Sequence, residues 1–214
     1  MRVTHLGHAC LLIESSGTRI LIDPGAYSTG FEDLRDLDAV LVTHFHGDHI
    51  DPERFPALVE TNPNARLLIE PQTIETYDLS TATAISAGDT ALMGDLEVRA
   101  VGGHHASNHD LIPPVGNVGF LLRSDQGPML FHPGDCYDET PPGVDILALP
   151  LNAPWCRMRE TLDFMRAVNP RVAVPIHDGL LNDDGRAAYL MHVERFGPAD
   201  TDVVDLHLGQ SYDA

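Results

Sequence analysis

Basic residues are scarce in this sequence of 214 residues. It holds 13 Lys and Arg against 32 Asp and Glu, which gives a formal net charge of −19. Binding to nucleic acid or to an anionic membrane surface needs a cluster of basic side chains, and so few of them, spread along the chain, can hardly form one. The composition disfavours both as general partners and leaves open only a local basic groove.

Cysteines and long apolar runs are also scarce. Cys10, Cys136 and Cys156 are odd in number, widely spaced and in no CxxC pair, which favours reduced thiols over a disulfide framework or a cysteine-built zinc site. No segment approaches the roughly 18 apolar residues that span a bilayer. The start, "MRVTHLGHACLLIE", has no apolar core ending in a cleavage site, so we expect a cytoplasmic protein.

The remaining composition is that of a globular protein. Hydrophobic residues make up 43% and charged residues 21% of the chain, which disfavours wholesale disorder. There is no repeat of fixed period, no low-complexity stretch and no evident linker. We therefore expect a single domain over residues 1–214.

Apolar runs bounded by turn residues predict many strands. They are "MRVTHLG", "ACLLIESS", "TRILID", "DAVLVTH", "ARLLIE", "DTALMGD", "LEVRAVGG", "NVGFLLRS", "GPMLFHPGD", "VDILALP" and "RVAVPIHDG". Helices are predicted from Pro52 to Glu60, and at "RMRETLDFMRAVNP" and "GRAAYLMHVERFG". This mixture predicts a layered α/β or α+β fold.

Polar side chains cluster in "VLVTHFHGDHID", residues 40–51, at the end of an apolar strand. His44 and His46 are two residues apart, so an extended backbone points both imidazoles to the same side. Asp48 and His49 follow within a turn and supply a second set of ligands. Because buried imidazoles and carboxylates need partners, we interpret the cluster as a metal site rather than as ordinary surface or capping histidines.

A catalytic zinc site takes about three protein ligands and keeps one position open. Further ligands should therefore follow other strands. His104 and His105 end "LEVRAVGGHH", and His177 ends "RVAVPIH". Asp135 ends "PMLFHPGD", where a carboxylate could bridge two ions.

These motifs resemble the metallo-β-lactamase superfamily of metal-dependent hydrolases. They look most like its branch of small hydrolases related to the ascorbate-6-phosphate lactonases, and the resemblance covers nearly the whole chain. The segments that carry it are "THLGHACLLIE", "ILIDPG", "LVTHFHGDH", "FHPGD" and "VPIHD". The resemblance implies an αββα sandwich of two mixed β-sheets flanked by helices, with the metals at the sheet edge.

The resemblance also implies a ligand set and a mechanism. The ligands of one metal would be His44, His46 and His105, those of the other Asp48, His49 and His177, with Asp135 bridging. His105 is preferred to His104 because the branch places this ligand before a small residue, here Ala106. Two zinc ions, with Mn²⁺ or Fe²⁺ as alternatives, would activate a bridging hydroxide, and Asp48 and Asp135 would act as catalytic residues around it.

The sequence allows two interpretations of the role of each of four further residues. Asp23 either makes a turn before Pro24 or holds a ligand imidazole in the correct tautomer. His8 and Asn117 either line the pocket or are ordinary core or loop residues. His109, on the loop after His105, either contacts substrate and transfers a proton or is merely exposed.

The leading functional hypothesis is a metal-dependent hydrolase that acts on a small-molecule ester, lactone, amide or phosphoester. The first alternative is a mononuclear iron oxidoreductase of the dioxygenase type on the same scaffold. The second alternative is a nuclease or phosphodiesterase, which the acidity of the chain disfavours. A homo-oligomer is left open.

Overall fold

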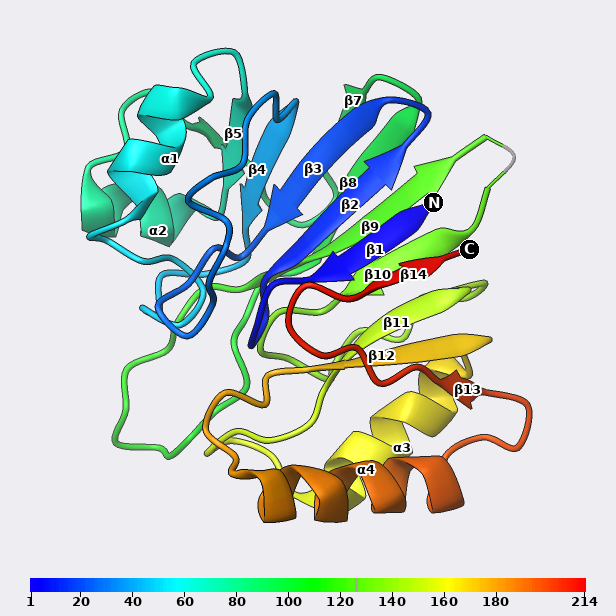
Figure 1. Cartoon of the computed structure of the whole chain (residues 1–214). Coiled ribbons are helices and arrows are strands. Elements are labelled where there is room, and N and C mark those ends of the chain that lie inside the picture. Colours follow the sequence, from blue (N-terminus) through cyan, green and yellow to red (C-terminus); the bar gives the residue numbers. More distant parts are fainter. Residues whose placement is uncertain (126) are drawn as a thin grey trace.

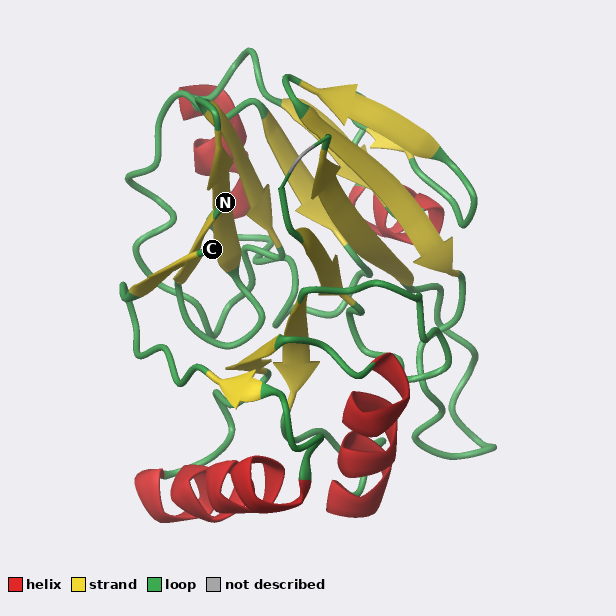
Figure 2. Ribbon diagram, turned by 90° about the vertical axis from the view of Figure 1, so that its right-hand side faces the viewer, coloured by secondary structure: helices red, strands yellow, loops and turns green. Residues whose placement is uncertain are grey.

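Two β-sheets face each other, and helices cover their outer faces, in the computed structural model (Figure 1). The structure describes residues 1–125 and 127–214. Figure 2 shows the same arrangement from the side, with strands inside and helices outside. The predicted αββα sandwich of two mixed sheets is confirmed.

The first sheet has the strand order β14-β1-β2-β3-β4-β5-β6. Strand β2 pairs antiparallel with both β1 and β3, whereas β3 and β4 pair parallel. The bounds are β1 Arg2–His5, β2 Leu11–Ser15, β3 Thr18–Ile22, β4 Ala39–Val42, β5 Arg66–Ile69, β6 Thr83–Ala84 and β14 Ser211–Asp213.

The second sheet has the order β13-β12-β11-β10-β9-β8-β7. Strands β7 to β10 pair antiparallel, and β10 to β13 pair parallel. The bounds are β7 Thr90–Met93, β8 Leu96–Gly102, β9 Val118–Ser124, β10 Met129–His132, β11 Ile146–Pro150, β12 Val172–Ile176 and β13 Asp202–Val203.

Four helices complete the layers among the described residues: α1 Phe55–Thr61, α2 Pro71–Tyr77, α3 Met158–Val168 and α4 Asp183–Phe196. The first two pack on the first sheet through Phe55, Leu58, Ile74 and Tyr77. The other two pack on the second sheet through Phe164, Met165, Leu190 and Val193. None of these helices is long and apolar enough to cross a membrane.

Strand alternation divides the apolar residues among three cores. In β3, Ile20 and Ile22 lie in the core between the sheets, whereas Leu21 faces the core under α1 and α2. In β4, Leu41 faces inward and Val40 outward in the same way. Because strands in the middle of this sandwich are buried on both faces, they appear in the sequence as continuous apolar runs.

One helix prediction needed correction, and one helix was not predicted. Helix α1 begins at Phe55 rather than at Pro52, because the side chain of Asp51 accepts hydrogen bonds from the N–H groups of Glu53 and Arg54 in a turn before the helix. Helix α2 was not predicted. Its start is fixed by Glu70, whose carboxylate caps the first turn, and by the proline that follows it.

The strands that matter for the site all end on one edge. In the first sheet, the parallel strands β3 and β4 end together. In the second sheet, β8 and β10 are both antiparallel to β9 and therefore run in the same direction. Strand β12 also runs in this direction, because β10, β11 and β12 pair parallel. A hydrogen bond from the Val118 N–H to the Thr43 carbonyl, 3.0 Å long, joins the two sheets at this edge.

Candidate metal centre

Two groups of ligand-type side chains meet where these strands end. One consists of His44, His46, His105 and Asp135, and the other of His8, Asp48, His49 and His177; within each group the ligand atoms lie within 4.8 Å of one another. Every residue predicted as a metal ligand is present in one group or the other. The addition is His8, which the sequence suggested only as a pocket residue.

Asp135 lies between the two groups. Its Oδ1 is 3.0 Å from Nε2 of His49, and its Oδ2 is 3.1 Å from Nε2 of His177 and 3.4 Å from Nε2 of His105. Oδ2 therefore lies beside one histidine of each group, which is the position that a bridging ligand requires.

Hydrogen bonds fix the tautomer of His49 and His44. The Nδ1–H of His49 donates to Oδ2 of Asp23 over 2.7 Å, which leaves Nε2 directed toward Asp135. Thr43 donates its hydroxyl proton to Asp23 and accepts from Nδ1 of His44 at 2.9 Å, so Nε2 of His44 carries no proton and faces Nδ1 of His46 at 3.0 Å. Asp23 therefore does more than make a turn: it orients the imidazoles that face the site.

Backbone carbonyls orient two more imidazoles in the same manner. Nδ1 of His105 donates to the carbonyl of Ala106 over 2.6 Å, and Nδ1 of His177 donates to the carbonyl of Asn152 over 2.7 Å. Both rings thus present an Nε2 lone pair to the centre of the site. His104 is exposed and belongs to neither group, whereas His105 belongs to the group of His44, His46 and Asp135.

These atoms are left without partners of their own. Among the described residues, five buried side-chain atoms form no hydrogen bond, and four of them are Nε2 of His49, His105 and His177 and Oδ1 of Asp135. Unpaired buried polar atoms are costly, and here they converge. Nitrogen and carboxylate donors in this arrangement fit divalent transition metals such as zinc.

The protonation states of His44 and Asp135 suit metal binding. Burial, with the nearby His49, lowers the pKa of His44 well below its usual value. Burial opposes ionisation of Asp135, but His49 and His177 hold the pKa of this carboxyl well below its usual range. A neutral imidazole and an ionised carboxylate are the forms in which these groups bind metals.

The pKa of His49 is shifted in the other direction. Burial lowers it, but Asp135 and then Asp23 raise the pKa of this imidazole well above its usual value. In the protein without metal, a proton on His49 therefore supplies positive charge between two carboxylates. A metal ion that takes Nε2 of His49 must displace this proton.

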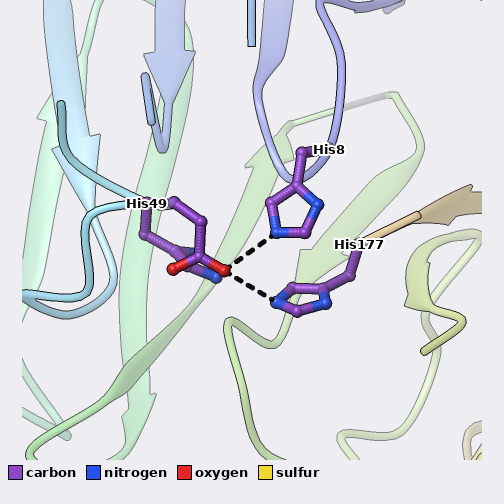
Figure 3. A group of neighbouring side chains, drawn as sticks. His8, His49 and His177 are labelled. Atoms are coloured by element: carbon purple, nitrogen blue, oxygen red, sulfur yellow. Dashed lines mark hydrogen bonds and ion pairs between the residues drawn. The ribbon is translucent and has the colours of Figure 1, made fainter. Parts of the chain in front are cut away.

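His8 differs from the other members of its group. Its Nδ1 accepts a hydrogen bond of 3.1 Å from the N–H of Gly179, so the ring proton is on Nε2. That N–H donates to Oδ2 of Asp48 over 3.1 Å, and Nε2 of His177 lies 3.6 Å from the same oxygen; Figure 3 marks both contacts with dashed lines. In this tautomer His8 holds the carboxylate of Asp48 and has no lone pair to offer a metal.

Two polar side chains hold Asp135 in place. The indole N–H of Trp155 donates to Oδ2 of Asp135 over 2.9 Å. Sequence reasoning missed this contact, because the only signal was an aromatic residue near a helix start. Asn117 is buried, and it accepts from the N–H of Asp135 and donates to the carbonyl of Pro133. It braces the turn that carries Asp135.

His109 lies in neither metal-ligand group. It helps to line a hollow of about 240 Å³ beside His46 and His105, which the loop after β8 forms. Its Nδ1 accepts the N–H of Leu111 over 3.1 Å, a bond within the loop. A catalytic role for His109 stays a prediction.

The backbone is unusual at three of these residues. His8, Asp23 and His177 have φ angles of 51°, 50° and 58°, in the left-handed region that side chains other than glycine seldom adopt. Such conformations cost of order 1–3 kcal/mol each and persist only where the surroundings enforce them. The site is thus held by its neighbours in a conformation that its segments would not choose alone.

The chain matches the family model described as "Beta-lactamase superfamily domain" over residues 2–177. It is 42% identical over 205 residues to Protein Rv0786c of Mycobacterium tuberculosis, covering 95% of this chain and 96% of that protein. It is also 30% identical over 198 residues to a protein named UPF0173 metal-dependent hydrolase from Carboxydothermus hydrogenoformans, covering 83% and 84% of the two chains.

A solved structure has the same fold. Igni18, described as a metallo hydrolase from the hyperthermophilic archaeon Ignicoccus hospitalis, superposes with a TM-score of 0.74 at 20% identity. The match covers 100% of this chain and 98% of Igni18. At this level of identity, the likeness concerns the fold.

Proposed function

The chain belongs to the beta-lactamase superfamily, and from this we propose that it is a metal-dependent hydrolase, with two zinc ions, that acts on a small-molecule ester, lactone, amide or phosphoester. The single observation that carries the proposal is the convergence of unpaired buried donor atoms on one point at the sheet edge. Metal ions bound by these atoms would remove the cost of leaving them unpaired.

Two sets of residues would hold the metals. His44, His46 and His105 would hold one ion and Asp48, His49 and His177 the other, with Asp135 shared between them. When bound, the ions would lower the pKa of a water molecule toward neutrality and polarise the scissile carbonyl or phosphoryl oxygen.

The chain's own residues prepare this chemistry. Asp23 and the carbonyls of Ala106 and Asn152 keep the imidazoles in the tautomer that exposes Nε2. His8 and Trp155 donate hydrogen bonds to Asp48 and Asp135, which keeps these carboxylates ionised and aimed at the site. No serine or cysteine nucleophile is needed, and the proposal assigns none.

Metal content per chain tests the proposal directly. Protein purified without a chelating tag should contain about two zinc ions by elemental analysis, and Asp135→Ala should contain fewer and lose activity. The matched control is Asp163→Ala, which removes an exposed carboxylate on α3 and should change neither. Full metal content in Asp135→Ala would contradict the bridging role.

Metal identity also separates the alternatives. A single iron per chain would favour the oxidoreductase, and activity confined to polynucleotides would favour the nuclease. An absence of bound metal, even after zinc or iron is supplied, would overturn the proposed function.

A further inference from the structure

The hollow beside the candidate metal centre has an apolar wall. It is formed by the loop between β8 and β9, which projects at the lower left of Figure 1. Ile112, Pro113, Pro114 and Val115 line the hollow together with His46 and His105 of the site. A substrate held at the metals would therefore place part of its structure against aliphatic side chains.

No basic residue lies in this wall. The sequence contains no lysine, so all 13 basic residues are arginines. The one formally charged residue among those that line the hollow is Asp110, which is acidic. An anionic group of a substrate in the hollow would meet no counter-ion, and its removal from water would be uncompensated.

Two arginines near the site are already engaged elsewhere. Arg54 pairs with Glu32 and Asp51 and lies over the ring of Phe31. A bound substrate could recruit this guanidinium only by breaking those bonds.

Arg186 is engaged in the same way. It donates to Asp178, the residue after His177, over 2.7 Å and also pairs with Asp205. Neither of these arginines offers a free cation to a substrate.

Hydrogen bonds hold the wall in shape. The N–H of His105 donates to the carbonyl of Val115 over 2.9 Å and closes the base of the loop. The N–H of Ala106 donates to the carbonyl of Asp135 over 2.8 Å, and that of Gly116 to Oε1 of Gln72 on α2 over 2.8 Å. Because the loop is tied to the site and to a helix, the wall exists before a substrate arrives.

We propose that the substrate is an uncharged ester or lactone with a short apolar chain, which packs against Ile112 and its neighbours in this hollow. This inference rests on the proposed function. At about 240 Å³ the hollow is smaller than the roughly 300–1,000 Å³ of pockets for drug-sized ligands, so the chain is short. A phosphate or carboxylate remote from the reacting carbonyl is excluded, because only the reacting group lies at the metals.

The reaction is a hydrolysis, so water is the only co-reactant. The oxygen of water forms a bond to the carbonyl carbon, the bond from that carbon to the ester oxygen breaks, and the alcohol leaves with one proton of the water. The acyl group departs as a carboxylic acid.

A matched pair of esters tests the inference. 4-Nitrophenyl hexanoate and mono-4-nitrophenyl adipate have acyl chains of the same length, but the adipate ends in a carboxylate. With background hydrolysis subtracted, kcat/KM for the hexanoate should exceed that for the adipate by roughly 100-fold. Equal values, or a preference for the adipate, would overturn the proposed substrate class and leave the hydrolase assignment intact.

A variant pair locates the preference in the wall. Ile112→Arg places a cation in the hollow and should reduce the ratio at least about tenfold by raising kcat/KM for the adipate. The control is Leu92→Arg, because Leu92 is likewise an exposed aliphatic residue but lies on β7. A ratio unchanged in Ile112→Arg, or changed equally in both variants, would place the substrate elsewhere.

Binding gives a readout independent of turnover. Trp155 is the only tryptophan in the chain and contacts Asp135, so its fluorescence reports on ligands at the site. Hexanohydroxamate should bind more tightly than the monohydroxamate of adipic acid. This preference without turnover of either ester would overturn ester hydrolysis but support an uncharged ligand, whereas equal binding would overturn the inference itself.

Discussion

Gly25 is the residue at which a single methyl group should disturb the site most directly. A Cβ at this position would lie 1.8 Å from the carbonyl oxygen of Asp48 and 2.6 Å from the backbone nitrogen of His49. Real Cβ atoms essentially never approach other atoms within 3.0 Å, so Gly25→Ala must move the segment of Asp48 away by about 1.2 Å. Two hydrogen bonds, from Ala26 to Gly47 and from Asp51 to Pro24, oppose this movement.

The magnitude follows from these contacts. Overpacking costs about 1–3 kcal/mol, and each backbone hydrogen bond that breaks costs about 1 kcal/mol more. We expect Gly25→Ala to lower the free energy of unfolding by about 2–4 kcal/mol, which corresponds to a Tm lower by roughly 5–15 °C for a chain of this size. Since the displaced segment carries Asp48 and His49, metal affinity should fall about 10- to 100-fold.

Gly47→Ala is the matched control, because it adds the same methyl group to the neighbouring loop but nothing lies within 4 Å of its Cβ. Thermal unfolding without metal and zinc competition with a chromophoric chelator would measure the two effects separately. A Gly25→Ala protein with the Tm and zinc affinity of the control would refute the reasoning. A loss of stability with unchanged affinity would show that Gly25 supports the fold but does not position Asp48.

Three other perturbations have defined outcomes. His8→Gln keeps an N–H for Asp48 and should retain the metal content of the wild type, whereas His8→Leu should weaken binding about 10- to 100-fold; an equal loss in both variants would make His8 a ligand. Trp155→Phe removes the donor to Asp135 and should weaken zinc binding about tenfold with little change in Tm; unchanged affinity would show that the indole N–H is dispensable. The hydrogen bond from Arg186, together with the charge of the guanidinium, lowers the pKa of Asp205. The ion pair of these two residues should therefore stabilise the fold fully above about pH 4, and this stabilisation should be lost as the pH falls through the lowered pKa. Urea unfolding at pH 7 and pH 3 should show that this loss is absent in Arg186→Gln, and an identical pH dependence of the two proteins would count against it.

The sequence predicted the fold and most of the site because both depend on local patterns. Continuous apolar runs mark strands buried on both faces, and polar residues directly after them mark the edge where parallel strands end. His44, His46 and His177 could be located by this rule alone. Asp23 was interpreted as either a turn residue or a carboxylate that orients a ligand imidazole, and its hydrogen bond to His49 agrees with the orienting role.

What the sequence did not predict depends on contacts between distant segments. Strand β14 pairs with β1 across almost the whole chain, and a segment of three residues carries no signal for such a partner. The roles of His8 and Trp155 depend on which atoms of Gly179 and Asp135 lie beside them. Helix α2 is short, and the pair Glu70 and Pro71 was a local signal for its start that was not used.

The residues of the candidate metal centre come from both sheets, and this affects the order of events in folding. His44 and His177 are separated by 133 positions in the chain, yet both belong to the site. Contacts of such long range form late, because the entropy of closing the intervening loop must be overcome first. During synthesis, a chain that lacks β12 holds the "THFHGDH" segment without its partners. A spectroscopic ion such as Co²⁺ would therefore report the docking of the two sheets rather than the formation of either one.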